Sequence, residues 1–190
     1  MIKLIAFLGN PGNDYSRTRH NIGWMLADYI LWTEKANWRD KYKGFFTSEQ
    51  VEDATRLFLK PTTFMNRSGS SLKNVMDFYG LSAEEILVIH DDIEIPFGFA
   101  GIKFSGGLGG HNGLRSISNH LGTRDYYRFR LGVSRPDHSD IASYVLSAFS
   151  KEEQTELPVF LKRASTLLES HLWDLEEAVK THPKVFLLEA

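Results

Sequence analysis

Four polar clusters in the sequence combine residue types that could carry out acid–base chemistry or hold a substrate. The first follows an apolar run at residues 2–8 and extends from Gly9 to Asn21. It contains His20, whose imidazole titrates near neutrality and is therefore suited to act as a general base. A structural or surface histidine is the alternative at this position. The loop lacks both glycine signatures of nucleotide binding, so it does not predict a cofactor site.

The second cluster, residues 61–69, places an aromatic side chain beside an amide in a loop that enters a helix. Phe64 and Asn66 would suit a substrate with a flat face and a carbonyl group. The alternative is structural: Asn66 or Ser68 would cap the helix, and Phe64 would join Met65 in the core. The sequence favours neither interpretation over the other.

The third cluster, His90 to Glu94, follows another apolar run. A carboxylate at a strand end can accept a hydrogen bond from a distant histidine, which fixes the tautomer of that histidine and makes it a stronger base. His90, Asp91 and Asp92 could instead bind a divalent metal, but consecutive carboxylates need not converge on one point. No His-x-His or His-Glu-x-x-His motif accompanies them.

The fourth cluster is the glycine-rich run from Gly106 to Leu114, which opens a predicted helix ending near Gly122. Backbone amides at a helix N-terminus, with Lys103 and Arg115 nearby, would favour an anion such as phosphate. A mobile loop without a ligand is the alternative. The chain has no cysteine and no Gly-x-Ser-x-Gly motif, so a covalent acyl-enzyme has no obvious nucleophile. Direct attack by water is the simpler chemistry.

Helices and strands that alternate along the chain must position these clusters. Apolar residues recur at helical spacing over Ile22–Ile30 and over Leu72–Tyr79, where Gly80 is a plausible C-terminal stop. A further apolar stripe runs from Leu161 to Val179, with Pro158 near its start.

Strand signals lie between these helices. Ser82 begins a capping box just before one of them. Strands are predicted at residues 2–8, 44–51, 56–60, 86–90, 99–104 and 128–134, and the second and third of these form a hairpin. The sequence therefore predicts an α/β fold: a single three-layer domain over residues 1–190, with a mixed, mostly parallel central sheet flanked by helices.

The composition limits the class of partner. A chain of 190 residues, 42% of them hydrophobic, fits one domain with a buried core. The absence of cysteine excludes a disulfide framework and a thiolate zinc site. The net charge of −2 argues against a coat of positive charge, yet residues 101–136 hold six basic residues and one acidic residue, which indicates a local anionic partner. The first apolar run is too short for a secretory signal or a membrane span.

Taken together, these motifs resemble the bacterial-type peptidyl-tRNA hydrolase family. They follow the family's order and spacing, and the resemblance covers nearly the whole chain; from Ser150 onward only length and helical character match. The matching motifs are Gly9-Asn10-Pro11-Gly12 with Tyr15, Thr18-Arg19-His20-Asn21, Phe64-Met65-Asn66 with Ser68-Gly69, His90-Asp91, Gly109-Gly110-His111-Asn112-Gly113-Leu114, Arg130-Leu131-Gly132-Val133 and Tyr144-Val145-Leu146.

The resemblance implies a monomeric, cytoplasmic esterase without metal or cofactor, which recycles tRNA by cutting the ester between the peptide and the terminal ribose of peptidyl-tRNA. His20 would be the general base, Asp91 would sustain its basic form, and Asn10 would help to distinguish a blocked from a free α-amine. The residues that would bind the end of peptidyl-tRNA are Tyr15, Phe64, Asn66 and Asn112. From the local charge we also expect Lys103 and Arg130 to meet tRNA phosphates.

Two alternatives remain open at this stage. One is a catalytically silent protein of the same fold that binds RNA or another partner. The more distant one is a metal-dependent peptidase or phosphatase that uses His90, Asp91 and Asp92.

Overall fold

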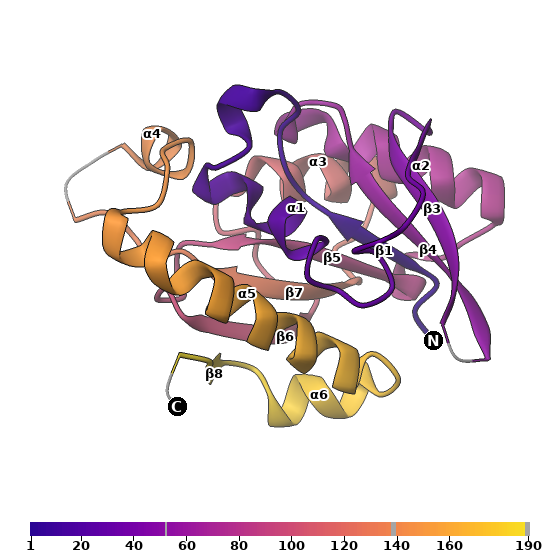
Figure 1. The fold of residues 1–190 in the computed structure, drawn as a ribbon. Helices are drawn as coiled ribbons and strands as arrows, with labels where there is room; N and C mark the ends of the chain where they lie inside the picture. The colour runs from indigo at the N-terminus through magenta and orange to yellow at the C-terminus, as the bar shows by residue number, and fades with distance from the viewer. Residues whose placement is uncertain (52, 138–139, 189–190) are drawn as a thin grey trace.

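An eight-stranded mixed sheet forms the centre of the computed structural model (Figure 1). The structure describes residues 1–51, 53–137 and 140–188. Parallel pairing joins the four central strands and antiparallel pairing joins the outer ones, so the sheet is mixed, as predicted. Among the described residues three strand pairs are parallel and four antiparallel, so the sheet is not mostly parallel, because the short edge strands add antiparallel pairs. Across the sheet the order is β2 (Arg39–Lys41), β3 (Gly44–Val51), β4 (Ala54–Pro61), β1 (Leu4–Phe7), β5 (Ile86–Asp92), β7 (Tyr127–Gly132), β6 (Phe99–Phe104) and β8 (Val185–Phe186).

The six predicted strands are all present, and β3 and β4 form the predicted hairpin. The two strands that the sequence did not predict, β2 and β8, have three and two residues and lie at the edges of the sheet. The three residues of β2 are all exposed and polar, so no apolar alternation could mark that strand.

Helices cover both faces of the sheet, which confirms the three-layer prediction. On one face lie α1 (Ile22–Leu26) and α5 (Lys151–His171), and on the other α2 (Ser68–Tyr79) and α3 (Asn112–Leu121). Strand β1 is buried on both sides because its alternate residues serve different layers: Ile5 packs in the core under α1 and α5, and Ala6 in the core under α2 and α3. The shorter elements are α4 (Ile141–Val145), α6 (Leu175–Thr181) and the 3₁₀ turns η1 (Asn13–Tyr15), η2 (Arg19–Asn21), η3 (Met65–Arg67) and η4 (Ala83–Glu85).

Some predicted helix boundaries are wrong. The stripe from Leu161 to Val179 is divided between two helices, because Asp174 accepts a hydrogen bond from the Glu177 amide and so caps a new helix, α6. Pro158 lies inside α5 rather than near its start, since a capping box at Ser150 begins that helix earlier. The helix predicted over Ile22–Ile30 is α-helical only as far as Leu26.

Other expectations about the helix ends are settled as well. Gly80 ends α2 in a left-handed conformation, and Ser82 forms the predicted capping box, so both predictions are confirmed. Neither Asn66 nor Ser68 caps α2, whose N-cap residue is Arg67, and Phe64 is 55% exposed rather than in the core.

Two glycines allow the close approaches that shape the site. A Cβ at Gly23 would lie 2.7 Å from the carbonyl oxygen of Leu8, so α1 can rest directly on the end of β1. A Cβ at Gly69 would lie 2.2 Å from the carbonyl oxygen of Ser116, so any side chain there would push α2 away from α3. The Gly69 amide also donates a 3.0 Å hydrogen bond to Ser116 Oγ, which fixes the two helices against each other.

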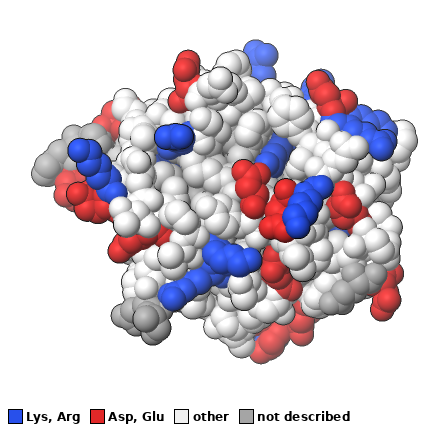
Figure 2. All heavy atoms as spheres, in the orientation of Figure 1, with Lys and Arg blue, Asp and Glu red and all other residues white. Residues whose placement is uncertain are grey.

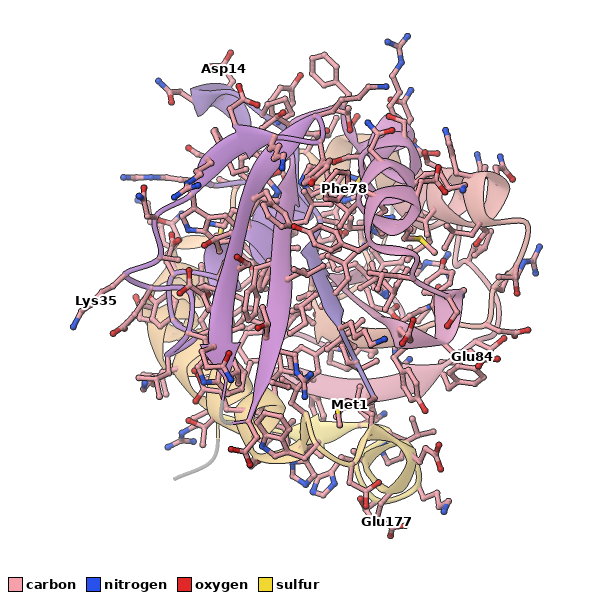
Figure 3. The ribbon with its side chains drawn as sticks, turned by 90° about the vertical axis from the view of Figure 1, so that its right-hand side faces the viewer. Met1, Asp14, Lys35, Phe78, Glu84 and Glu177 are labelled. Carbon is pink, nitrogen blue, oxygen red and sulfur yellow. The ribbon has the colours of Figure 1, made fainter. Side chains whose placement is uncertain are left out.

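The sheet has two distinct ends. Figure 3 shows Asp14, in η1 after β1, at one end, and Met1, Glu84 and Glu177 at the other. Within the described residues, none of the helices has the length and apolar character needed to cross a membrane.

Candidate active site

The candidate active site lies where the parallel central strands end. Asn10 comes shortly after β1, and Met65 comes shortly after β4. Asp91 is the second-to-last residue of β5, at the carboxyl end of that strand. Parallel strands present their carboxyl ends at one edge of the sheet, and α/β folds place their sites at this edge. The topology therefore gathers side chains that are far apart in the sequence.

A short hydrogen bond joins His20, on η2, to Asp91. Nδ1 of His20 lies 2.8 Å from Oδ1 of Asp91, and both residues are buried. Burial alone would raise the pKa of Asp91, but His20 and His111 hold that pKa well below its usual range, so Asp91 is a carboxylate. Burial alone would lower the pKa of His20, but the charge of Asp91 and its hydrogen bond raise it above its ordinary value. A carboxylate only accepts, so Nδ1 of His20 carries the proton and neutral His20 keeps a lone pair on Nε2.

His111 is a second histidine bound to Asp91, and the sequence did not assign it a role. Its Nε2 lies 2.9 Å from the same oxygen, Oδ1. Its Nδ1 accepts hydrogen bonds from the amides of Gly113 and Leu114, and so caps α3. Since Nδ1 must therefore be unprotonated, His111 carries its proton on Nε2 and donates it to Asp91. The sequence signal was the position of His111 before a helix, but only the fold brings it to Asp91.

His20, Asp91 and His111 also lie close enough together to suggest a metal site, since their ligand atoms are within 4.8 Å of one another. A metal on Nε2 of His111 would move the proton of that ring to Nδ1, against two amide donors. The hydrogen bonds of the site therefore favour a proton network over a metal centre.

The cluster from His90 to Glu94 does not converge on one point. His90 donates from Nδ1 to the carbonyl oxygen of Asp91, and burial together with His111 holds the pKa of His90 well below its ordinary value. Asp92 instead accepts from Arg130 at 3.5 Å and from the Glu94 amide at 2.9 Å. The two consecutive aspartates therefore serve different partners, and this geometry disfavours the metal centre considered for His90, Asp91 and Asp92.

A cavity of about 550 Å³ opens beside the His20–Asp91 pair. His20 lines it, and no described residue binds its Nε2, so the lone pair is available to a molecule in the cavity. Helix α4 contributes Ile141 and Val145 to the wall. Of the residues predicted from the sequence, those that line this cavity are His20, Asp91, Lys103, Asn112 and Arg130.

The remaining predicted residues form a neighbouring group outside the cavity lining. Asn10 accepts a 2.7 Å hydrogen bond from the Met65 amide through Oδ1, which links the loops after β1 and β4. Asn21 holds the backbone of Asn10 with two hydrogen bonds of 2.9 Å. The ring of Tyr15 meets that of Phe64 edge to face, with 6.3 Å between centroids. Asn66 is exposed on η3, next to Met65.

Arg19 fixes the position of η2, although the sequence gave it no separate role. Its guanidinium donates to Ser147 Oγ, to the Ala148 carbonyl and to Glu153, at 2.8, 2.5 and 2.6 Å. It also stacks on Tyr144 of α4, 4.2 Å from the ring centroid. The turn that carries His20 is therefore tied to α4, in the cavity wall, and to the start of α5.

The basic residues of the predicted patch differ in their environments. Arg128 is buried and donates to the carbonyls of Gly106 and Gly107, so it supports the glycine-rich loop where both line the cavity. Arg130 is bound to Asp92 and to the Pro183 carbonyl. On the face shown in Figure 2, basic and acidic side chains are interspersed, so this face has no coat of one sign.

This fold and site define an α/β protein with a buried histidine–aspartate pair at the carboxyl edge of its parallel strands, a class of site suited to hydrolysis by activated water. The chain belongs to the peptidyl-tRNA hydrolase family, whose sequence model matches residues 4–185.

Individual relatives cover almost the whole chain. A peptidyl-tRNA hydrolase of Sulfurovum sp. (strain NBC37-1) is 44% identical over 180 residues, with 94% of each chain covered. One of Sulfurimonas denitrificans is 42% identical over 179 residues, also with 94% of each covered. A crystal structure of a peptidyl-tRNA hydrolase in complex with N-propanol is similar with a TM-score of 0.86 and 30% identity, over 94% of this chain and 93% of that one. A crystal structure of the peptidyl-tRNA hydrolase of Acinetobacter baumannii is similar with a TM-score of 0.80 and 29% identity, over 96% of each chain.

Proposed function

We propose that this protein hydrolyses the ester bond between the peptide, or an N-blocked aminoacyl group, and tRNA in peptidyl-tRNA, with water activated by His20. The observation that carries the proposal is the hydrogen-bonded pair of His20 and Asp91. Nε2 of His20 is available beside a cavity large enough for the end of such a substrate. Membership in the family supplies the class of substrate.

The chemistry follows from the tautomer of His20. Its Nδ1–H is held by Asp91, so Nε2 accepts a proton from water as the water oxygen bonds to the ester carbonyl carbon. The bond between this carbon and the ribose oxygen then breaks, and the imidazolium returns the proton to the ribose oxygen. A general base of this kind contributes about 10²–10⁴-fold to the rate.

Neutral amides would hold the acyl group without regard to its side chains. Oδ1 of Asn10 is occupied by the Met65 amide, so Nδ2 is the group that Asn10 has left to donate to a substrate carbonyl. Asn112, in the cavity wall, and Asn66, on the surface of η3, would bind further along the acyl and ribose groups. Tyr15 and Phe64 would offer an aromatic surface to the same end of the substrate.

The tRNA itself would be held through its backbone. Lys103 and Arg130 line the cavity, and cations there would meet phosphates in any tRNA sequence. We expect the enzyme to act as a monomer in the cytoplasm. We also expect it to need no metal or cofactor, since the His20–Asp91 pair itself activates the water.

An assay with N-acetyl-aminoacyl-tRNA and free aminoacyl-tRNA, in the presence and absence of a chelator, tests the proposal. We expect rapid release of tRNA from the acetylated substrate only, unchanged by the chelator. Tight binding of the tRNA without turnover would instead support a catalytically silent binding protein, and loss of activity with the chelator would support a metal-dependent enzyme.

A further inference from the structure

Two histidines that the hydrolytic site does not use lie side by side at the ends of the last two helices. His171 is the last residue of α5, and His182 directly follows α6. Their ring centroids are 4.1 Å apart, and the rings are tilted by 56°. Both side chains are half-buried, so the pair is open to small solutes. In Figure 3, Glu177 places α6 at the end of the sheet opposite Asp14.

Hydrogen bonds fix the same tautomer in both rings. Nδ1 of His171 lies 2.9 Å from the Leu167 carbonyl, which only accepts, and 2.9 Å from Oγ of Ser170. That hydroxyl already donates its proton to the Leu167 carbonyl, so Nδ1 carries a proton of its own. Nδ1 of His182 lies 2.7 Å from Oγ1 of Thr181. That hydroxyl already donates its proton to the Glu177 carbonyl, so it accepts from His182. Each ring therefore keeps a lone pair on Nε2, and neither Nε2 has a hydrogen-bond partner among the described residues.

This is the arrangement that histidine ligands of metals adopt, with one ring nitrogen on the metal and the other donating to an oxygen. Metal–nitrogen bonds of about 2.0–2.1 Å place two adjacent imidazoles on one ion with centroids about 4.5–5 Å apart, slightly more than the 4.1 Å in this pair. The contrast with His111 is direct, because the proton of His111 is on Nε2, the nitrogen that a metal would need.

The surroundings also favour a cation. His171 lies at the C-terminal end of the long helix α5, where the helix dipole is negative. The charged residues in this part of α6 include Asp174, which caps the helix, and Glu177, which pairs with Lys180. Lys184 follows His182 but extends over the ring of Phe99.

We propose that His171 and His182 form a binding site for one late transition-metal ion, of the class of Cu²⁺, Ni²⁺ or Zn²⁺, with water at the remaining positions. Imidazole suits these ions, whereas Mg²⁺ prefers oxygen ligands. The bound ion clamps the end of α5 to the end of α6.

The bound ion would fix the segment at His182 and Pro183, which contacts Arg130 of the cavity lining. The carbonyl of His182 accepts from the Ile102 amide, and the next carbonyl, of Pro183, accepts from Arg130. An ion on the two histidines therefore stabilises the folded state through the attachment of this segment to β6 and β7.

The test titrates the full-length chain, without a histidine tag, with NiCl₂, ZnCl₂ or MgCl₂, and follows binding by calorimetry and Tm by thermal unfolding. The variants are His171→Asn and His182→Asn. The matched control is His120→Asn, since His120 also donates from Nδ1 to a carbonyl four residues earlier but is not paired with another histidine ring among the described residues. We expect one Ni²⁺ or Zn²⁺ per chain and a rise in Tm of about 5 °C at saturating metal, with no response to MgCl₂.

His171→Asn and His182→Asn should each weaken Ni²⁺ binding at least tenfold, while His120→Asn should bind as the parent does and all three should keep the parent's hydrolytic activity. Electron paramagnetic resonance of the Cu²⁺-loaded parent provides a measurement that needs no variant, and should show coupling to two imidazole nitrogens. The proposal is overturned if neither substitution weakens binding, if binding is lost only with His20→Ala, or if the parent binds none of the transition metals.

Discussion

His111 and Asp91 are joined by a hydrogen bond of 2.9 Å between Nε2 and Oδ1, and this is the oxygen that also accepts from His20 at 2.8 Å. One carboxylate oxygen thus serves two imidazoles. The donation by His111 withdraws part of the negative charge that Asp91 presents to His20, so the basicity of His20 depends on both residues.

Replacing His111 by Asn should make His20 more basic. Asparagine is a good N-cap and can keep α3 capped, but its shorter side chain cannot reach Asp91. Asp91 would then act on His20 alone and raise the pKa of His20 further, so the acidic limb of the pH profile of kcat/KM should move to higher pH. A limb that stays in place would show that His111 only caps the helix.

Asp91→Asn should move the same limb in the opposite direction. The charge of Asp91 holds the pKa of His20 above its ordinary value in spite of burial, and an amide removes the charge while the burial remains. The pKa of His20 should fall, so the base stays unprotonated to lower pH, while the maximal rate drops because the ring loses its fixed tautomer. Identical pH profiles for parent and variant would contradict a role of Asp91 through His20.

His20→Ala should abolish nearly all hydrolysis while the protein stays folded and still binds tRNA. The loss should be about 10²–10⁴-fold and should lie in kcat, since His20 is the one described histidine of the cavity wall that donates to the Asp91 carboxylate through Nδ1 and keeps Nε2 free. Single-turnover kinetics with N-acetyl-aminoacyl-tRNA measures it. Activity within about tenfold of the parent would exclude His20 as the base.

The order of strands and helices could be predicted because it depends on local patterns. Strand β5 is a continuous apolar run and α2 ends at a glycine, and both signals are visible in the sequence. The division between α5 and α6 was not predicted, because the apolar stripe continues across it and only the cap formed by Asp174 marks the new helix. Phe64 was ambiguous because an exposed aromatic residue and a core residue look alike in a sequence.

The candidate site could be predicted residue by residue but not as a network. The motif around His20 and the position of Asp91 at a strand end indicated an acid–base pair, and the structure brings the two within hydrogen-bond distance. The role of His111 depends on which of its nitrogens faces the amides of α3. The position of the Arg130 side chain depends on a hydrogen bond to the carbonyl of Pro183, more than fifty residues away in the sequence. Such contacts are set by tertiary packing, so no local pattern predicts them.

Replacement of Asn10 and of Asn66 by Ala should have different effects on the stability of the protein and on its substrate specificity. Asn10→Ala leaves the buried Met65 amide without its partner, so the free energy of unfolding should fall by about 1–3 kcal/mol, whereas the exposed Asn66 can be replaced with little change. Both variants should lower kcat/KM, but only Asn10→Ala should reduce the preference for blocked over free aminoacyl-tRNA. Denaturant unfolding and the two kcat/KM values measure this, and an unchanged preference in Asn10→Ala would remove Asn10 from discrimination.

Lys103 and Arg130 should contribute to tRNA binding through phosphate contacts, but to different extents. No described residue forms an ion pair with Lys103, so its whole charge is available in the cavity wall. Arg130 already binds Asp92 and the Pro183 carbonyl, and the carboxylate offsets part of its charge. Asp92→Asn should therefore strengthen the contact of Arg130 with RNA and lower KM for full-length substrate.

Lys103→Ala should raise KM for full-length peptidyl-tRNA and reduce the slope of log K against log salt by about 0.7–0.9, the value for one lost phosphate contact. Arg130→Ala should have a smaller effect on the slope, because Asp92 already offsets part of the charge of Arg130 in the parent. A short ester without the tRNA body provides the control, since its turnover should hardly change in either variant. An unaltered salt slope in Lys103→Ala, or an equal loss with the short ester, would show that these cations do not bind the tRNA backbone.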